Sequence, residues 1–481
     1  MPTPIIRQRA EHNISRRDID PDALKVLYRL VRSGYTAYLV GGGVRDLLLG
    51  RKPKDFDVST NATPKELRKL FSNCFLIGRR FRLAHLRYGD KIIETSTFRA
   101  TPQHQGDDLL QTDDNVFGTP EEDALRRDFT VNGLFYDIDT FSVIDYVGGL
   151  EDLGKKVIRS IGDPLVRFRE DPVRMLRAIR FAARLHFTID PETLSAISVC
   201  KEEIRKTSRP RLLEEVYRLF MFGAGETSMR LLLQTGMLEE LLPSVARYFC
   251  DFAASGRPVE DAPLWRHLHE ADARGLTEPE QFLAALYFPL IIEKLGMEPM
   301  MMSQRDLQKG FDEVVWPFLD RYGAPRHTRD LARLLVTTQH RFYLQNRRHG
   351  KFSKVKFMTQ GWFAPAFLQF QINYAVHGGP ESLLERWQQL VAEFSADAAR
   401  AENGFSGQTP GGTPDNGDAP RRKRRRRKPR RRHHSAENPA PTTGGAPDAG
   451  GFSADAGAPA ENPEQRANDE EGRGPTYAFD E

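Results

Sequence analysis

The pattern of hydrophobic and polar residues changes character along the chain. In residues 21–160, short apolar runs bounded by turn residues predict strands, and segments with three- to four-residue apolar spacing predict helices. The predicted strands are 37–40, 56–59, 81–88, 91–98 and 141–147. The predicted helices begin at Pro21, Val44, Thr63 and Thr119, the last two with a capping-box pattern. This mixture predicts a small mixed β-sheet with helices packed on it.

Beyond about residue 160 the strand signals fade and helical spacing dominates. The predicted helices there are 172–185, 211–220, 229–242, 280–294, 330–344 and 380–394. The composition shifts once more near the end, where residues 401–481 contain 12 Gly and 10 Pro. Such a segment buries too little apolar surface to offset its chain entropy, so we expect disorder. The predicted fold class is α+β: a mixed head, then all-α domains and a disordered C-terminal tail.

These shifts divide the chain into segments. Residues 1–20 are polar and weakly patterned, which predicts a flexible arm, and residues 99–118 predict a long polar loop. The expected domains are a head at 21–160, a helical neck at 161–250, a helical C-terminal domain at 251–395 and a tail at 396–481.

Composition excludes several classes of protein. The 481 residues are 39% hydrophobic and 28% charged, which permits a sizeable core. Cys74, Cys200 and Cys250 lie far apart without CxxC spacing, which excludes a disulfide scaffold and argues against structural zinc. The sequence contains no signal-peptide pattern and no run of about 18 apolar residues. We therefore expect a cytoplasmic protein that does not cross a membrane. We also expect a monomer, although nothing in the sequence determines the oligomeric state.

The net charge of +4 averages over segments that differ sharply. Residues 421–432 hold eleven Arg or Lys in twelve positions, interrupted by Pro429. This basic block consists of Arg421, Arg422, Lys423, Arg424, Arg425, Arg426, Arg427, Lys428, Arg430, Arg431 and Arg432. A dense cationic run in a disordered tail favours salt-sensitive, sequence-independent contact with RNA phosphates over a merely solvated charge run.

The clearest chemical pattern begins with the glycines Gly41 to Gly43 between a predicted strand and a predicted helix. The backbone N–H groups of such a turn can cradle phosphates. A following strand carries Asp55 and Asp57, which share one face because strand side chains alternate. Two Mg²⁺ ions about 3.5–4 Å apart suit such a carboxylate pair and support nucleotidyl transfer. The sequence lacks GxxxxGK[ST], which excludes a P-loop, and lacks GxGxxG, which argues against a dinucleotide site.

Two further acids are candidates for a third carboxylate at this site. Glu94 lies on a neighbouring predicted strand, where a solvent-facing edge position is an equally good interpretation. Asp128 follows two arginines, which fits either an ordinary ion-pair cluster or an acid near the metals with guanidinium groups on a triphosphate. The spacing does not decide between the two acids.

Four segments together resemble the class II nucleotidyltransferases of the DNA polymerase β superfamily: LVGGGVRDLLLG, KDFDV, RRDFTVNGLFYD and REDPVRMLRAIRFAARL. That family comprises CCA-adding tRNA nucleotidyltransferases and bacterial poly(A) polymerases. The resemblance covers roughly residues 20–250, with the motifs in the family's order. The segment LIGRRFRLAH, which contains Arg79, Arg80 and Arg82, and the arginine-rich tail are similar to the poly(A) polymerase branch.

The resemblance implies roles for individual residues. Asp55 and Asp57 match the metal-binding acids, and Asp128 matches a third acid that the family counts with the active site. The matching nucleotide-binding positions are Gly42, Gly43 and Arg45 in the triphosphate-binding turn, with Arg127 and Asn132.

Selection of the base is implied by an EDxxR motif, in which Asp171 and Arg174 match the acid and arginine that read the incoming nucleotide. By its own pattern, Asp171 is an ordinary N-cap followed by proline at the first helical position. A basic stripe then follows, formed by Arg174, Arg177, Arg180 and Arg184, whose first three members we take as nucleotide-binding. The spacing does not reveal whether the site accepts A alone or A and C.

These features predict template-independent transfer of AMP from ATP to an RNA 3′-hydroxyl, with two Mg²⁺ ions and release of pyrophosphate. RNA contacts are expected at Arg79, Arg80, Arg82 and the basic block, and RNA-decay proteins or an RNA chaperone are the expected protein partners. The alternatives are a CCA-adding tRNA nucleotidyltransferase and, from another class, a non-catalytic RNA-binding adaptor. A metal-dependent phosphohydrolase is disfavoured because no suitable HD dyad occurs.

Overall fold

The computed structural model describes residues 3–78, 83–100, 116–344 and 353–405, except for the side chains beyond residue 396. The chain divides into two compact units, Met1–Gln408 and Thr409–Glu481. The second unit, which contains the basic block, lies outside the described residues. The domain boundaries expected near residues 160 and 250 fall inside the first unit and stay predictions.

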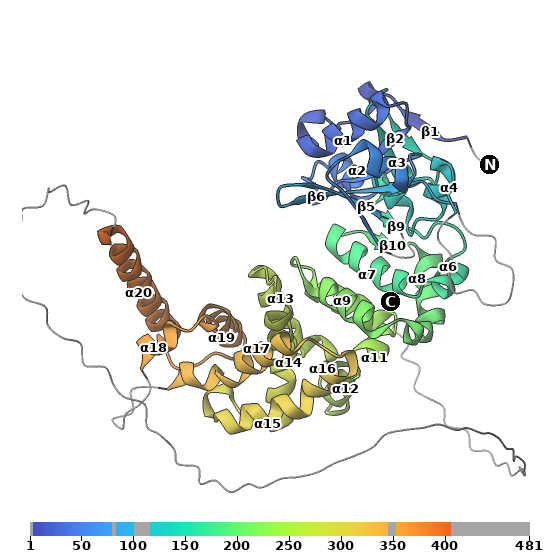
Figure 1. Cartoon of the computed structure of the whole chain (residues 1–481). Coiled ribbons are helices and arrows are strands. Elements are labelled where there is room, and N and C mark those ends of the chain that lie inside the picture. Colours follow the sequence, from blue (N-terminus) through green and yellow to red (C-terminus); the bar gives the residue numbers. More distant parts are fainter. Residues whose placement is uncertain (1–2, 79–82, 101–115, 345–352, 406–481) are drawn as a thin grey trace, which may run out of the picture. The chain divides into compact units, whose positions relative to one another are not determined.

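Eight strands form one mixed sheet in the order β1-β8-β7-β2-β3-β6-β5-β4 (Figure 1). Their bounds are β1 Ile5–Arg7, β2 Ala37–Val40, β3 Asp57–Thr60, β4 Cys74–Ile77, β5 Leu83–Tyr88, β6 Lys91–Thr97, β7 Leu134–Asp137 and β8 Val143–Asp145. Neighbouring strands are antiparallel except β3 and β6, which run parallel with Val58 opposite Thr95. This parallel pair brings together two segments that are far apart in the sequence.

The predicted strands agree with the structure where hydrophobic alternation is clear. The strand at 37–40 and the hairpin of β5 and β6 are confirmed, whereas β3 begins one residue later than expected, at Asp57. The sequence analysis missed β4 and β7. The first three residues of β7 are all buried, so both faces of this strand are apolar and it has no alternating pattern.

The prediction of a flexible arm at residues 1–20 is wrong for the part that the structure describes. Strand β1 adds to the edge of the sheet, with Ile6 opposite Ile144 of β8. Nearby, a ring nitrogen of His12 lies 2.9 Å from the carbonyl oxygen of Phe141. A three-residue edge strand is held by backbone hydrogen bonds to a distant strand, so its own side chains carry too little pattern to reveal it.

Helices cover the sheet. The first, third and fourth begin where predicted, whereas the second begins at Gly42, two residues before the expected Val44. Their bounds are α1 Pro21–Arg32, α2 Gly42–Leu48, α3 Pro64–Leu70, α4 Pro120–Leu125 and α5 Gly149–Lys155. The expected capping boxes are confirmed at Thr63 with Glu66 and at Thr119 with Glu122. In α1, Ala23, Val26 and Leu27 are buried against the sheet, because the apolar residues recur at helical spacing.

The chain after the sheet is mainly helical, as expected. The bounds are α6 Pro164–Glu170, α7 Val173–Leu185, α8 Pro191–Cys200, α9 Arg209–Phe220, α10 Gly225–Gln234, α11 Met237–Leu241, α12 Pro243–Ala254, α13 Pro263–Ala273, α14 Pro279–Leu295, α15 Gln304–Val314, α16 Trp316–Tyr322, α17 Arg326–Thr337, α18 Lys354–Met358, α19 Phe363–His377 and α20 Leu383–Phe405. A short parallel pair, β9 Val157–Ile158 and β10 Thr188–Ile189, flanks α6 and α7.

The largest differences between the predicted and observed helix boundaries concern three helices. The helix expected at 229–242 is two helices, α10 and α11, because Gly236 adopts a positive φ of 69° between them. The helix expected at 330–344 stops at Thr337 and continues as a 3-10 turn. Helix α20 extends to Phe405, past the expected start of the tail at residue 396.

The helical part has its own buried centre. Helix α14 packs against α13, α15, α17 and α19, and its residues 282–291 are all buried. A helix that is apolar on every side is stable only when other helices surround it, which explains this position. Among the described helices, none is both long enough and apolar enough to cross a bilayer.

We predict that Gly149→Ala destabilises the fold, because a Cβ atom at Gly149 would lie 2.2 Å from the carbonyl oxygen of Thr130. The expected loss is roughly 1–3 kcal/mol in the free energy of unfolding, measured by denaturant titration. Gly154→Ala is the matched control in the same helix, because a Cβ there has nothing within 4 Å. It should be neutral or stabilise by up to about 1 kcal/mol. Equal stability of the two variants would contradict the close packing at Gly149.

Candidate active site

Three carboxylates lie at one end of the parallel strand pair. Asp57 is the first residue of β3, and Asp55 precedes it in an exposed position. The register that pairs Val58 with Thr95 places Asp57 beside Glu94 of β6 when it is continued by one residue. Glu94, whose side chain is 50% exposed, also lies 3.6 Å from the imidazole of His85 on β5. The pairing of β3 with β6 therefore brings Glu94 to the predicted metal-binding acids.

The surroundings of Asp57 disfavour the ionised form of its carboxyl group. Burial, together with the negative charges of Glu94 and Asp55, raises the pKa of Asp57 to about 6, although Arg127 acts in the opposite direction. A carboxylate that is partly desolvated beside two others is stabilised by a bound cation.

A cleft of about 270 Å³ opens over these strands. It is lined by Val40, Asp57, Val58, Ser59, Leu83, Glu94, Ser96, Arg99, Asp123, Arg126 and Arg127. The hydroxyl groups of Ser59 and Ser96 lie 3.1 Å apart across the two strands. The cleft therefore combines carboxylates with guanidinium groups, a combination suited to metal ions bound to a polyphosphate.

The side chains of this site suit Mg²⁺, which proteins usually do not enclose in a preformed cage. Carboxylate oxygens are hard ligands, and Mg²⁺ is usually held by one or two of them together with water and substrate phosphates. In the described parts of the chain, no three His, Cys, Asp or Glu side chains already converge on one point. Asp55 and Asp57, with Glu94 beside them, match the sparse protein ligation that leaves room for a nucleotide.

The glycine turn lies between β2 and α2. Gly41 has a φ of 67°, a conformation that favours glycine, and a Cβ there would lie 3.0 Å from Nη1 of Arg127. Gly42 and Gly43 form the first turn of α2, where backbone N–H groups have no partner within the helix. The turn thus brings free backbone donors and Arg127 close together.

A network of hydrogen bonds joins this turn to α7. Arg45, which is 4% exposed, donates from Nη1 to Oδ1 of Asn132 at 2.7 Å. Asn132 donates from Nδ2 to Oδ1 of Asp128 at 3.0 Å. Arg177 of α7 donates from Nε and Nη2 to Oδ2 of the same carboxylate, at 2.7 and 2.5 Å. Four predicted site residues from three separate segments therefore form one connected unit.

Asp128 has a very different environment from Asp57. Its carboxylate also accepts the backbone N–H of Phe129 at 2.9 Å. The charge of Arg177 and these hydrogen bonds lower the pKa of Asp128 to about 2, although burial alone would raise it. Asp128 does not line the cleft of Asp57. Of the two candidates for a third carboxylate, Glu94 lies beside Asp57, whereas Asp128 belongs to the hydrogen-bond network with Arg177 and Asn132. The geometry therefore favours Glu94.

The single aromatic side chain of α7, Phe181, lies against several cations. The guanidinium carbons of Arg45, Arg177 and Arg180 all lie over the ring of Phe181, at 5.2, 5.2 and 5.0 Å from its centroid. Arg180 also pairs with Glu215 of α9 at 3.2 Å, and burial lowers its pKa to about 10. Of the predicted basic stripe, only Arg177 and Arg180 meet at this ring, which the sequence analysis did not single out. Arg174 pairs with Glu170, and Arg184 lies over Phe222.

The predicted N-cap at Asp171 is wrong. Asp171 closes α6 instead, and α7 begins only after Pro172, which itself has helical backbone angles. The Asp171 side chain accepts a hydrogen bond from Arg211 at 2.8 Å through Oδ2, whereas its Oδ1 is buried without a partner. Arg174 is buried and donates weakly, at 3.4 Å, to Glu170. Because Asp171 does not cap α7, its Oδ1 is available as a hydrogen-bond acceptor for another group.

Several positioning residues escaped the sequence analysis. Buried Asp123 accepts from Arg126 at 3.3 Å and from Arg127 at 2.9 Å, and so orients both at the cleft. Arg167 donates to the carbonyl oxygens of Arg126 and Arg127 at 2.6 and 2.9 Å, which joins α6 to the same segment. The spacing of Asp123 from the two arginines on a predicted helix was the available signal.

Some predicted RNA contacts lie outside the described residues. These are Arg79, Arg80, Arg82 and the basic block of residues 421–432. They stay predictions.

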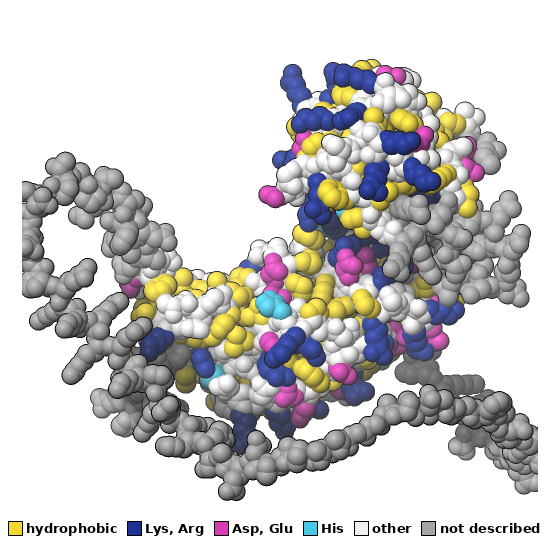
Figure 2. Space-filling view, in the orientation of Figure 1, with side chains coloured by type: hydrophobic (Ala, Val, Ile, Leu, Met, Phe, Trp, Pro, Cys, Tyr) yellow, Lys and Arg dark blue, Asp and Glu magenta, His cyan; other side chains and the backbone are white. Residues whose placement is uncertain are grey.

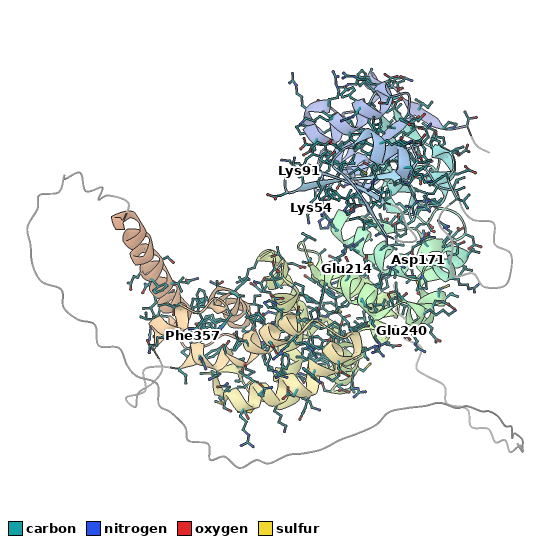
Figure 3. The ribbon with its side chains drawn as sticks, viewed as in Figure 1. Lys54, Lys91, Asp171, Glu214, Glu240 and Phe357 are labelled. Carbon is teal, nitrogen blue, oxygen red and sulfur yellow. The ribbon has the colours of Figure 1, made fainter. Side chains whose placement is uncertain are left out.

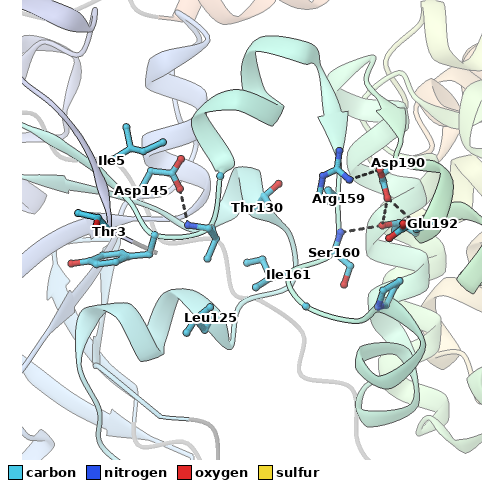
Figure 4. A pocket seen from close by; sticks show the side chains of 16 residues that line it. Thr3, Ile5, Leu125, Thr130, Asp145, Arg159, Ser160, Ile161, Asp190 and Glu192 are labelled. Atoms are coloured by element: carbon cyan, nitrogen blue, oxygen red, sulfur yellow. Dashed lines mark hydrogen bonds and ion pairs between the residues drawn. The ribbon is translucent and has the colours of Figure 1, made fainter. Parts of the chain in front are cut away.

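A second cavity, of about 540 Å³, does not contain this chemistry (Figure 4). It lies among β8, the start of α5 and the segment before α6, and its two central ionic groups are already engaged. Asp145 accepts the backbone N–H groups of Val147, Gly149 and Leu150. Arg159 donates to Asp152 and Asp190. Size therefore does not identify the active site here.

We predict that Asp128→Asn lowers the free energy of unfolding by about 3–5 kcal/mol near neutral pH, because Arg177 loses its buried counter-charge. The ionised carboxylate stabilises the fold at pH values above its ordinary pKa of 3.8, and this contribution is lost as the pH falls toward about 2. The difference in Tm between wild type and variant should therefore be constant above about pH 5 and shrink below about pH 4. Glu151→Gln, which removes an exposed pair with Lys155, is the control and should change stability by less than about 1 kcal/mol. A difference in Tm that grows on acidification would contradict the assignment.

Comparison with known proteins matches both the sheet region and part of the helical region that follows it. A family model described as the poly A polymerase head domain matches residues 37–159, and one described as the probable RNA and SrmB-binding site of polymerase A matches residues 186–249. The first match contains the carboxylates, the glycine turn and Asp128. The second contains α9, α10 and α11.

Individual relatives extend the match along the chain. Poly(A) polymerase I of Salmonella typhi is 40% identical over 430 residues, 86% of this chain and 90% of that protein. The CCA-adding enzyme of Lactobacillus johnsonii is 39% identical over 220 residues, 46% of this chain and 54% of that protein. The crystal structure of the Bacillus stearothermophilus CCA-adding enzyme in complex with CTP has a TM-score of 0.56 and 26% identity, covering 79% of this chain and 83% of that one. The chain therefore belongs to the poly(A) polymerase family of nucleotidyltransferases.

Proposed function

We propose that this chain transfers AMP from ATP to the 3′-hydroxyl of RNA with the cleft at β3 and β6 as its active site. The observation that carries the proposal is the juxtaposition of Asp57 and Glu94 with Arg127 in one cleft. Nucleotidyl transfer needs acids to hold metal ions and cations to neutralise the triphosphate, and this cleft supplies both. The family's name agrees with a poly(A) product.

Asp55 and Asp57 would hold Mg²⁺, with Glu94 as the third carboxylate. When bound, the metal ions favour the ionised 3′-hydroxyl and stabilise charge on the triphosphate. Asp57 has the most to gain from a bound cation, because its pKa is raised to about 6 by burial and by its acidic neighbours. Asp128, held by Arg177 and Asn132, would act as a positioning residue and would not bind metal.

The glycine turn and the arginines would hold the triphosphate. Gly42 and Gly43 offer backbone N–H groups at the first turn of α2, and Arg127 adds a cation at the same place. Arg45 is fixed by Asn132, so it would orient the turn without moving when the nucleotide binds. The preset donors would also stabilise the pyrophosphate as it leaves.

Asp171 and Arg174 would select the base. Support comes from the free Oδ1 of Asp171 and from the long, weak hydrogen bonds of Arg174, which a base edge could replace. Restriction to ATP is part of this proposal, as are RNA-decay proteins or an RNA chaperone as partners, a monomeric state and a cytoplasmic location.

We predict that Asp57→Asn lowers kcat on the order of a thousandfold, because it removes a ligand that would hold the metal ions. Glu94→Gln should lower kcat by less, since half of its side chain is exposed. Incorporation of labelled AMP into an oligoadenylate measures both effects, and fluorescence anisotropy without nucleotide checks that RNA still binds. Glu151→Gln serves as the surface control. Wild-type kcat in Asp57→Asn would refute the site.

The product identifies the branch of the family. Wild-type protein with ATP alone and an unstructured RNA should make a long A-tract, because base selection would reside in Asp171 and Arg174 and not in a template. With CTP alone the same RNA should not be extended. Addition of CCA to a truncated tRNA, without extension of unstructured RNA, would instead indicate the CCA-adding reaction. Full RNA binding without pyrophosphate release would indicate a non-catalytic adaptor.

A further inference from the structure

The turn between α9 and α10 holds a phenylalanine in an unusual backbone conformation. Phe222 has a φ of 68°, and Gly223 after it has a φ of 70°. The left-handed region is ordinary for glycine but uncommon for a bulky residue, which is found there where the surrounding structure imposes it. The conformation fixes the direction in which the Phe222 ring leaves the turn.

The ring is exposed, and cations from two other segments lie over it. Phe222 is 47% exposed. The Nζ atom of Lys54, in the loop before β3, lies 5.6 Å from the ring centroid, and the Cζ atom of Arg184 on α7 lies 5.0 Å from it. Figure 3 shows Lys54 on the edge of the sheet region nearest to α9, the helix that carries Glu214. The three residues form a small surface made by three segments, which we call the Phe222 platform.

Lys54 and Arg184 differ from the neighbouring arginines of α7 in having no acidic partner within the described structure. Arg177 and Arg180, earlier on the same face of α7, pair with Asp128 and Glu215. In the described part of the chain, neither Lys54 nor Arg184 forms an ion pair with an acid, and both are exposed. Exposed cations without a counter-charge are available to phosphates.

The position of the platform links it to the proposed active site. Lys54 immediately precedes Asp55, and Arg184 lies two turns of α7 beyond Arg177, which binds Asp128. Figure 2 shows a group of Lys and Arg side chains at the lower edge of the sheet region, on the face that is visible. An exposed aromatic ring contacted by cations that have no acidic partner in the described structure resembles the sites that hold single-stranded nucleic acid, in which bases stack on the ring and phosphates meet the cations.

We propose that the Phe222 platform binds the RNA strand near its 3′ end, with a base stacked on the Phe222 ring and its flanking phosphates on Lys54 and Arg184. This inference rests on the proposed function. Its occupant is RNA and not ATP, because the triphosphate donors lie at the glycine turn and the base-selecting residues at the start of α7. A stacking site has no preference for base identity, which suits an enzyme that extends unrelated RNA ends.

The test compares Phe222→Leu with Phe222→Trp in the full chain. Leucine keeps apolar contact but removes the aromatic face, so we expect KM for an oligoadenylate to rise about five- to fiftyfold. KM for ATP should change less than about twofold, and Phe222→Trp should restore KM for RNA. Phe75→Leu is the matched control, because Phe75 is also exposed, at 51%, and also carries a cation, Arg87, at 4.8 Å. It should leave both constants unchanged.

A binding measurement separates stacking from a purely structural contact. The indole introduced by Phe222→Trp should be quenched by a single-stranded oligoadenylate and not by a blunt duplex, whose bases are already stacked, with the wild-type chain as the fluorescence background. An unchanged KM for RNA in Phe222→Leu overturns the platform while leaving the proposed function intact. A rise in KM for ATP alone also overturns it. Absence of AMP incorporation by the wild-type chain would overturn the proposed function instead.

Discussion

The ion pair between Asp128 and Arg177 is the interaction on which the arrangement of the site depends. It joins the segment after α4 to α7, and through Asn132 it reaches Arg45 and the glycine turn. A buried pair contributes little net stability compared with apolar packing, because both charges must leave water. Its value lies in direction, because both oxygens of the Asp128 carboxylate accept hydrogen bonds from donors at fixed positions. The groups that we propose to bind the nucleotide come from distant parts of the sequence, and this network fixes their positions without a substrate.

Asp57 and Asp128 show how environment separates residues of the same type. Both are motif acids, but the pKa of Asp57 is raised to about 6 and that of Asp128 is lowered to about 2. The first lies beside other carboxylates and gains from an added cation, whereas the second already has its cation in Arg177. A carboxylate that lies beside other carboxylates is suited to bind a metal ion. A carboxylate that is already paired with an arginine is suited to fix protein segments relative to one another.

The sequence predicted those features that are encoded locally. The capping boxes at Thr63 and Thr119 form as expected, since each needs only a few adjacent residues. The acids Asp55 and Asp57 could be named from spacing, but the choice of Glu94 as their neighbour needed the parallel pairing of β3 with β6. Strand β1 was missed, and the N-cap interpretation of Asp171 was wrong, for the same reason. Partners far along the chain, β8 and Arg211, decide them, and no short pattern records such partners.

The basic residues of α7 differ in whether each has an acidic partner. Arg174, Arg177 and Arg180 each face an acid, Glu170, Asp128 and Glu215 respectively. Within the described structure, Arg184 has aromatic contact with Phe222 but no acidic partner. Paired arginines are held rigidly and can present donors to a small ligand without loss of side-chain entropy, whereas an unpaired one keeps its full charge for a phosphate. Along α7, the arginines at the start are paired with acids, where we propose that the nucleotide binds. Arg184 near the end has no acidic partner in the described structure, and there we propose that RNA binds. The net charge of +4 carries no trace of this difference, because most of the cations concerned are neutralised by acids within reach.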